Sequence, residues 1–342
     1  MFKALQKPVY MMGMGRRGGG GGGTGGGSTT PGGSRTFNYL SAPTSVSAQM
    51  NGSTTMADGN TLSTWYFSNG GGFNGDRTVP SPVIEANEGS TVQITLNSMM
   101  PHTIHLHGLD VDQQNDGVPT TSFTVGGMGN SNSYTYTFLA PHAGTYHYHC
   151  HVDTVLHYEM GMYGAIIIRP ANGSTTEAWA GGPAFNKEYV WQLHTFDSSW
   201  HSGGGGGMGG GGMGGSNTSG TNTTRHSPDY FMINGRDGNN LNSDSTVAIS
   251  AGAGQKVLVR GVHSGYQPAM VKMGGLVFDV IASDGRPLPS AISATEWLMA
   301  PGERYDLLVT MPSSGQRTAT VDYYDIRLGR VLGTASTTIT VA

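Results

Sequence analysis

The residues best suited to chemistry surround the only cysteine of the 342-residue chain. Cys150 stands between His149 and His151, and His157 and Met162 follow shortly after it. The residues just before this stretch predict a β-strand. Because successive side chains of a strand point to opposite faces, we expect His149 and His151 to face one way and Cys150 the other. The stretch is therefore predicted to serve two separate sites.

An upstream segment, residues 101–108, repeats this arrangement with three histidines. His105 and His107 share one face of the predicted strand, and His102 falls on the opposite face. One predicted site gathers the two imidazoles, the thiolate and the weak thioether that are typical of a blue-copper electron-transfer centre: His102, Cys150, His157 and Met162. The other gathers four imidazoles, a set that suits copper, zinc, iron or nickel: His105, His107, His149 and His151.

The two predicted sites are covalently joined. Cys150 belongs to the first site, and its chain neighbours His149 and His151 belong to the second. The backbone thus connects an electron-transfer metal to an imidazole-bound metal, and we interpret the pair as a redox relay. A buried free cysteine is more often a small hydrophobic residue, but the flanking imidazoles argue against that alternative.

The chain resembles the multicopper oxidase family, which contains laccases, cuprous oxidases and the related copper nitrite reductases. In the first half the resemblance depends on the histidine segment 102–108, the Asp116-Gly117-Val118-Pro119 turn, and residues 149–151 with His157 and Met162. In the second half it extends through residues 230–235, 281–285 and 300–305. These later segments are typical of the family but carry no chemistry.

The resemblance implies a type 1 copper at the sulfur-containing site and type 2 and type 3 coppers at the histidine site, where dioxygen is reduced to water. It also implies that an acid at the position of Asp116 helps to deliver protons to oxygen. Burial could support that role by raising the pKa of the carboxyl group. A turn aspartate that makes only a local hydrogen bond is an equally good interpretation of Asp116.

Composition excludes several classes of partner. Charged residues make up 12% of the chain and the formal net charge is −4, so no basic surface indicates nucleic-acid binding. No apolar run is long enough for a transmembrane helix. The first residues contain Arg16-Arg17, but glycines follow where a secretory signal peptide needs an apolar core. The family resemblance implies an extracytoplasmic location, either periplasmic, secreted or at the cell surface.

Short alternating runs separated by glycine, asparagine and proline predict an all-β chain of two Greek-key β-sandwiches, which resemble cupredoxin domains. We expect a copper-binding domain at residues 37–170, a linker at 171–186 and a second cupredoxin-like domain at 187–342. A Gly/Met-rich tail, 1–36, and a Gly/Met-rich insertion, 203–224, flank these units as low-complexity segments. Their methionines are candidate Cu(I) ligands, although methionine is more often simply an apolar side chain.

The second domain departs from the family's pattern. Ala269, Lys272 and Gly274 occupy positions where the family carries histidine ligands, and residues 322–327 replace a His-Cys-His strand. One chain therefore offers four of the eight histidines that a three-copper cluster requires in related oxidases. A two-fold contact between copies of the first domain would double four to eight. We accordingly expect a homo-oligomer that completes the cluster.

The predicted function is that of a laccase-like oxidase, an oxidoreductase that takes electrons from a phenolic molecule or a metal ion such as Cu(I) and passes them to dioxygen. One alternative is an electron-transfer, copper-holding or structural assembly protein with an incomplete oxygen site. A copper nitrite reductase is a second alternative, but in those enzymes a non-ligand typically follows the cysteine, and His151 argues against it. The six other histidines lack paired spacing and are interpreted as surface or core residues: His142, His147, His194, His201, His226 and His263.

Overall fold

The computed structural model describes residues 34–35, 39–69, 78–201 and 225–342, all of which belong to one compact unit, Gly32–Ala342. Most of the predicted tail, 1–36, and the whole predicted insertion, 203–224, lie outside the described residues. The described chain consists largely of strands, which confirms the predicted all-β fold. None of its helices is long and apolar enough to cross a membrane.

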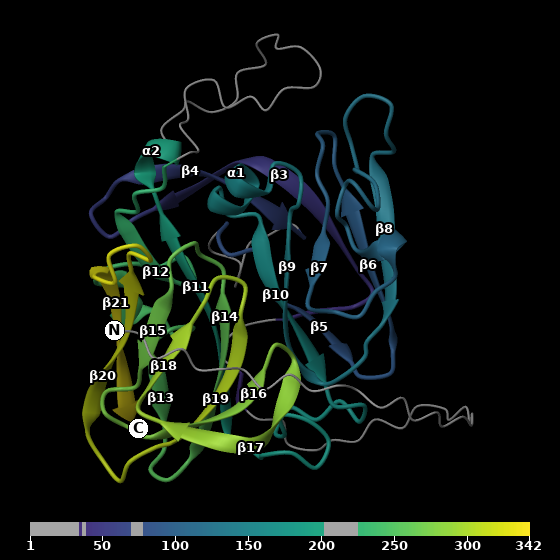
Figure 1. Ribbon diagram of the computed structural model, residues 1–342. Helices are drawn as coiled ribbons and strands as arrows, with labels where there is room; N and C mark the ends of the chain where they lie inside the picture. The colour runs from purple at the N-terminus through teal and green to yellow at the C-terminus, as the bar shows by residue number, and fades with distance from the viewer. Residues whose placement is uncertain (1–33, 36–38, 70–77, 202–224) are drawn as a thin grey trace. The chain divides into compact units, whose positions relative to one another are not determined.

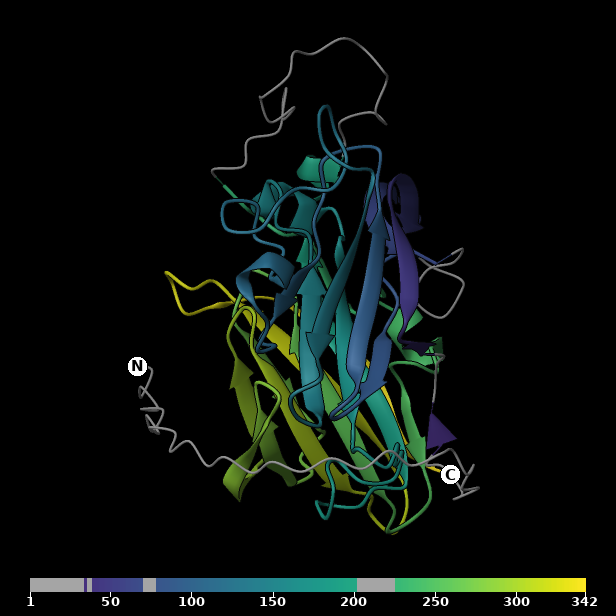
Figure 2. The ribbon, with the colours of Figure 1, turned by 90° about the vertical axis from the view of Figure 1, so that its right-hand side faces the viewer.

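The first half of the chain forms two sheets (Figure 1). One has the strand order β2-β5-β10-β9-β7, with β2 Leu40–Ser41, β5 Ile84–Asn87, β10 Tyr163–Arg169, β9 Gly144–His149 and β7 His105–His107. The other has the order β4-β3-β6-β8, with β4 Thr61–Ser68, β3 Thr44–Thr55, β6 Thr91–Asn97 and β8 Ser133–Leu139. Figure 2 shows the purple and blue strands of this second sheet side by side.

Side chains from both sheets meet in one hydrophobic core. In β6 buried and exposed residues alternate, as the sequence pattern predicts for a half-buried strand. Its Ile94 packs in the same cluster as Tyr148 of β9 and Ile166 of β10. Cys150 and Met162 belong to this cluster as well. The core of the first sandwich therefore surrounds the sulfur atoms of the predicted metal site.

The second half of the chain forms another pair of sheets. The larger has the order β1-β11-β14-β19-β16-β17 with β12 beside β11, and its bounds are β1 Ser34–Arg35, β11 Lys187–Phe196, β12 Tyr230–Ile233, β14 Lys256–His263, β16 Phe278–Ser283, β17 Arg286–Ala294 and β19 Arg304–Thr310. The smaller has the order β13-β21-β20-β15-β18, with β13 Ile249–Ala251, β15 Ala269–Lys272, β18 Glu296–Met299, β20 Gln316–Tyr324 and β21 Val331–Val341.

Strand β10 explains how the two sandwiches associate. All seven of its residues are buried. Ile166 and Ile168 face the first core, whereas Ala165 and Ile167 pack in another cluster with Val190 of β11 and with β14. A strand that is covered on both faces needs a continuous apolar run rather than an alternating one. Ala178 and Phe185, in the predicted linker between the sandwiches, are also buried. The boundaries of the two domains and of the linker stay a prediction.

The helices are short. They are η1 Gln113–Asn115, α1 Thr154–Glu159, α2 Ser198–His201 and α3 Asn240–Ser243. Helix α1 lies near α2 (Figure 1), because Leu156 and Met160 pack against Trp200 in one buried cluster. This contact brings the loop after Cys150 against the second sandwich.

Candidate metal centres

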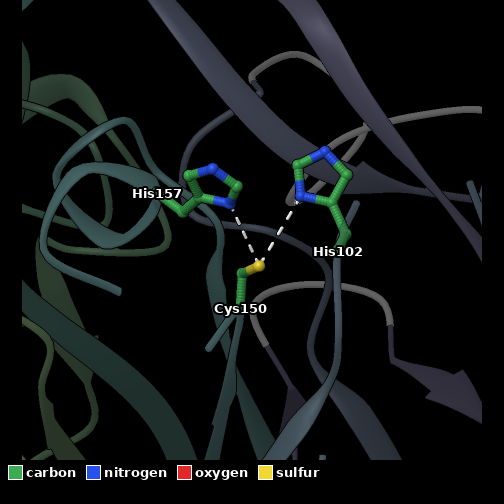
Figure 3. Close-up of side chains that lie close together, drawn as sticks. All are labelled: His102, Cys150 and His157. Atoms are coloured by element: carbon green, nitrogen blue, oxygen red, sulfur yellow. Dashed lines mark hydrogen bonds between the residues drawn. The ribbon is translucent and has the colours of Figure 1, made fainter. Parts of the chain in front are cut away.

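One sulfur and two ring nitrogens converge inside the first sandwich (Figure 3). The Cys150 Sγ atom lies 3.2 Å from Nδ1 of His157 and 3.5 Å from Nδ1 of His102. We call these three residues the sulfur group. All three are buried, and each offers its ligand atom to a common point. One thiolate with two imidazoles is the donor set that copper accepts in blue-copper proteins.

Three segments position the sulfur group. They are the β-bridge at His102, the end of strand β9 before Cys150, and helix α1, which carries His157. His102 is held by an isolated β-bridge to Val125. Strand β9 ends at His149 and is therefore shorter than the strand predicted from the sequence. Cys150 and His151 lie just beyond its end. The pairing persists one residue further, because the Cys150 N–H donates to the Met162 carbonyl at 3.0 Å. Cys150 still packs in the core, on the face predicted from strand parity.

Burial keeps the nitrogen donors of the sulfur group neutral. It lowers the pKa of His102 to about 4, and burial together with the neighbouring His102 lowers the pKa of His157 to about 3. Burial likewise raises the pKa of the Cys150 thiol to about 11. Neutral imidazoles bind a cation without first losing a proton, whereas a metal would displace the thiol proton. The group therefore fits copper in its chemistry as well as its geometry.

Met162 and Met160 occupy different surroundings. Met162 lies in the same core cluster as Cys150, and its N–H donates to the His157 carbonyl at 3.1 Å. Met160 packs instead with Leu156 and Trp200. These contacts favour Met162 as the axial thioether, and its role as a ligand stays a prediction.

A second cluster lies on the opposite face of β9. Strand β7 pairs with β9 so that His105 stands opposite His149. The ligand nitrogens of His105, His107 and His149 all lie within 4.8 Å of one another, and we call these residues the histidine group. His151 is the fourth predicted member and lies next to the group, with its ring centroid 5.2 Å from that of His105. The structure thus brings the four predicted imidazoles together.

Hydrogen bonds orient two of these rings. Nδ1 of His105 lies 2.7 Å from the Asp116 carbonyl oxygen, and Nδ1 of His149 lies 2.9 Å from the Cys150 carbonyl oxygen. A carbonyl only accepts, so each Nδ1 carries the hydrogen and each Nε2 keeps its lone pair. Metal-binding histidines in proteins are commonly oriented by this type of contact.

Asp116 contacts the histidine group directly. Its Oδ1 atom lies 3.3 Å from Nδ1 of His105, and its side chain is 31% exposed. It therefore contacts both a candidate ligand and solvent. The adjacent Gly117 has a φ of +75°, and a Cβ atom there would lie 1.9 Å from the Ile104 carbonyl oxygen. Glycine is required for this turn to pass so close to the preceding segment.

His147 is a neighbour of the histidine group that our sequence analysis assigned no role. It stands opposite His107 across the β7–β9 pair and is fully buried. Its Nε2 atom lies 2.7 Å from the Tyr158 hydroxyl group. The sequence contained a signal for this position, because His147 is two residues from His149 and so lies on the same face of the strand. The hydrogen bond with Tyr158 holds the His147 ring in place beside the histidine group.

A hollow of about 560 Å³ opens beside the sulfur group and reaches His102. Three methionines line it: Met50, Met99 and Met100. Met99 is 77% exposed and Met100 is 54% exposed. Thioether side chains therefore line the hollow on the side of the sulfur group, whose nearest member, His102, is itself buried.

The second sandwich offers no comparable cluster among its described residues. Lys272, which the sequence analysis predicts to stand at a histidine position of the family, forms an ion pair with Asp322 at 2.7 Å. His263 is buried, with its Nε2 atom 2.7 Å from the Gln267 carbonyl oxygen. The histidine group therefore receives no further imidazole from these positions.

Comparison with known proteins agrees with this arrangement. Two family models, both described as multicopper oxidase, match residues 64–173 and 213–341. The chain is 26% identical over 246 residues to the multicopper oxidase MmcO of Mycobacterium tuberculosis, a match that covers 68% of this chain and 46% of that protein. It is also 34% identical over 124 residues to a copper-containing nitrite reductase of Neisseria meningitidis, covering 35% of this chain and 28% of that one.

Among solved structures, the blue copper oxidase of Nitrosomonas europaea is similar with a TM-score of 0.65 and 27% identity. The match covers 87% of this chain and 85% of that chain. The curated relatives are longer, and this chain spans less than half of their length.

Proposed function

Since the chain belongs to the multicopper oxidase family, we propose that it takes single electrons from a reducing donor at the sulfur group and reduces dioxygen to water at the histidine group. Bound copper ions supply the one-electron redox chemistry and the binding of oxygen. Four one-electron oxidations and four protons convert one dioxygen molecule into two water molecules. The observation that carries the proposal is the adjacency of Cys150 to His149 and His151 in the chain.

The route for electrons is short. Covalent bonds lead from Cys150 to both neighbouring histidines. A second route uses the hydrogen bond of 2.9 Å between the Cys150 carbonyl oxygen and the His149 ring. Cys150 and His149 are buried in the interior of the first sandwich, where water does not disturb the geometry, whereas His151 is half-buried.

Absorption spectra and oxygen consumption test this function. Copper-loaded protein should show an intense blue charge-transfer band and should consume oxygen in the presence of a one-electron donor. Cys150→Ser should lose both, whereas His142→Gln, at an exposed histidine away from both groups, should keep both. Copper-loaded protein without the band, or unchanged oxygen consumption in Cys150→Ser, would overturn the proposal.

We assign proton delivery to Asp116. Its carboxylate lies beside His105 and is partly exposed, so it can take protons from solvent and hold them next to the histidine group. Asp116→Asn should slow oxygen reduction and change its pH profile, because the amide cannot exchange a proton. The blue band should stay unchanged. An unaltered pH profile would restrict Asp116 to its role in the turn.

The methionine-lined hollow suggests that the donor is Cu(I). Thioethers are soft ligands that select this ion, and three of them lie close to His102. Replacing Met99 and Met100 by leucine should raise the KM for Cu(I) and leave the KM for a phenolic donor nearly unchanged. Met128 offers a matched control, since it is 77% exposed but does not line the hollow. An equal loss with both donors would argue against a Cu(I) site.

A complete three-copper cluster requires imidazoles from a second chain. A two-fold contact between first domains would supply them and would give about 2.5 coppers per chain. A copper content near one per chain, or a monomer that reduces oxygen at full rate, would contradict a cluster shared between two chains. We also infer an extracytoplasmic location, which follows from the family.

A second candidate function is electron transfer or copper holding without oxygen reduction. The Lys272–Asp322 ion pair favours it, because it occupies a position where the family carries ligands. A normal blue band without oxygen consumption, in protein at its full oligomeric state, would support this function. Nitric oxide release from nitrite would indicate a nitrite reductase instead.

A further inference from the structure

A buried arginine of the second sandwich lies against the histidine group. Arg304 is the first residue of β19, and its side chain is 4% exposed. A Cβ atom on Gly108, the residue after His107, would lie 2.1 Å from Nη2 of Arg304. The guanidinium group therefore packs directly on the backbone next to His107. Our sequence analysis assigned residues 300–305 no chemistry, so this charge is an addition to the predicted site.

The turn before Arg304 covers the His107 ring. A Cβ atom on Gly302 would lie 3.1 Å from Cε1 of His107 and 3.5 Å from its Nε2 atom. On the other side of the ring, Nδ1 of His107 lies 3.3 Å from Nε2 of His149. The Nδ1 atom thus faces the histidine group, and the Nε2 atom faces the second sandwich. The second sandwich therefore contacts a candidate ligand although it supplies none of the four imidazoles.

Hydrogen bonds fix the guanidinium group in this position. Its Nη1 atom donates to the Gly302 carbonyl oxygen and lies 3.4 Å from Oδ1 of Asp284. The same Oδ1 atom accepts a hydrogen bond of 3.2 Å from the backbone N–H of Arg304. Two residues further along β19, Asp306 accepts a hydrogen bond of 2.6 Å from the Thr145 hydroxyl group of β9. These contacts hold β19 and its arginine against the strand that carries His149.

The positive charge of Arg304 is compensated only in part. The side chain of its ion-pair partner, Asp284, is 38% exposed. Water and salt screen an exposed carboxylate more than a buried cation. The Nε atom of Arg304 is buried without a hydrogen-bond partner. Burial lowers the pKa of Arg304, but arginine keeps its proton in proteins. A net positive charge therefore remains beside the histidine group.

The neighbouring imidazoles respond to this charge. Burial is the main cause that lowers the pKa of His107 to about 4, and the charge of Arg304 is the next cause. The carboxylate of Asp284 acts in the opposite direction and has a smaller effect. Arg304 also contributes to the lowered pKa of His147. A cation that acts on these rings also repels a metal cation bound to them and attracts an anion bound to that metal.

We propose that Arg304 sets the reduction potential and the anion affinity of the metal held by the histidine group. This inference rests on the proposed function, because it requires copper at that group. A fixed positive charge stabilises the lower oxidation state of a nearby metal and favours the binding of small anions to it. Arg304 thereby makes the histidine group a better acceptor for electrons from the sulfur group. It acts by its charge and is a positioning residue, not a ligand.

Azide binding to the histidine group measures the effect of this charge. The full chain with Cys150→Ser lacks the thiolate of the sulfur group, and after copper loading its absorption and EPR spectra report the histidine group. Adding Arg304→Met should raise the dissociation constant of azide roughly tenfold, as expected for one partly compensated charge at an effective dielectric constant near 20. It should also lower the reduction potential. Copper itself should bind at least as tightly as before, because a repulsive charge is removed.

Two further variants separate the charge from the fold. Arg304→Lys keeps the charge and should restore the azide affinity and the potential. Asp284→Asn keeps Arg304 and removes the charge that compensates it, so it should shift the azide affinity and the potential in the direction opposite to Arg304→Met. Shifts of Asp284→Asn and Arg304→Met in the same direction, or equal azide affinities in Arg304→Met and its parent, would overturn the proposal.

The parent protein distinguishes this inference from the function on which it rests. If the histidine group of the Cys150→Ser protein binds no copper, the proposed function fails and the role of Arg304 fails with it. If copper binds there but Arg304→Met changes neither the azide affinity nor the potential, the role of Arg304 fails alone. None of these measurements depends on oxygen consumption.

Discussion

The strongest stability prediction concerns Glu188, which lies at the contact between the two sandwiches and is 1% exposed. Its carboxylate accepts hydrogen bonds from Arg169 at 2.7 and 2.8 Å and from Arg260 at 2.6 Å. Arg260 also donates to Thr145, the second residue of β9, at 3.1 Å. This network therefore connects the second sandwich to the strand that leads to Cys150.

The cost of removing the charge of Glu188 follows from these contacts. A pair of unit charges about 4 Å apart contributes about 4 kcal/mol at an effective dielectric constant near 20, so Arg169 and Arg260 together contribute about 8 kcal/mol. Desolvation of the buried carboxylate opposes this by several kcal/mol. We expect Glu188→Gln to lower the free energy of unfolding by about 3–5 kcal/mol, because the amide loses both charge attractions. Each guanidinium group keeps one other carboxylate partner, Glu85 beside Arg169 and Asp306 beside Arg260.

Urea denaturation of the metal-free protein measures this loss. Asp322→Asn is the control, since it breaks the Lys272–Asp322 ion pair, whose lysine side chain is 36% exposed. A pair near the surface should cost only about 0–1 kcal/mol. Equal losses in the two variants would refute the reasoning that burial amplifies the interaction.

The same carboxylate gives a pH dependence. Burial alone would raise the pKa of Glu188, but the charges of Arg169 and Arg260 outweigh it and hold the pKa well below its usual range. A depressed pKa stabilises the folded state above the unfolded-state pKa and loses that contribution as the pH falls. The stability difference between wild type and Glu188→Gln should therefore be constant above about pH 5 and shrink at lower pH. A difference that grew in acid would contradict this assignment.

Two further predictions concern the candidate metal centres. Met162→Leu should shift the blue absorption band and the reduction potential, because a weak axial thioether tunes a blue-copper site, whereas Met160→Leu should leave both unchanged; the opposite pattern would make Met160 the ligand. Gly117→Ala should destabilise the protein by more than the about 1–2 kcal/mol that a left-handed conformation costs, since its Cβ would strike the Ile104 carbonyl oxygen. Gly89 has a similar φ but open space around it, so Gly89→Ala should lose only the free energy that the left-handed conformation costs. Equal unfolding free energies in the two variants would exclude the clash at Gly117.

Strand parity allowed both candidate sites to be predicted from the sequence. The alternation of side chains separates Cys150 from His149 without any knowledge of the fold. The β7–β9 register then places His105 opposite His149, as expected if both serve one site. The strand ends at His149 because the chain turns toward helix α1, and alternation alone contains no signal for that end.

The cluster of three histidines around the buried Glu159 carboxylate could not be predicted in the same way. His194 and His201 are seven residues apart and lie on different elements, and His226 follows a long insertion. They meet only because α1 packs against α2 through Leu156 and Trp200. Contacts between elements that are distant in the chain depend on tertiary packing, which local periodicity does not encode.

Helix α1 is the element on which the three clusters depend together. Within its six residues, His157 joins the sulfur group, Tyr158 contacts His147 beside the histidine group, and Glu159 forms the centre of its own group. A helix this short is not stable by itself, so these side-chain contacts must hold it. The contacts of Glu159 with His194, His201 and His226 thus fix the end of the same helix that carries His157 toward Cys150. Glu159→Gln should therefore weaken the blue absorption band of the copper-loaded protein although it removes none of the ligands of the sulfur group.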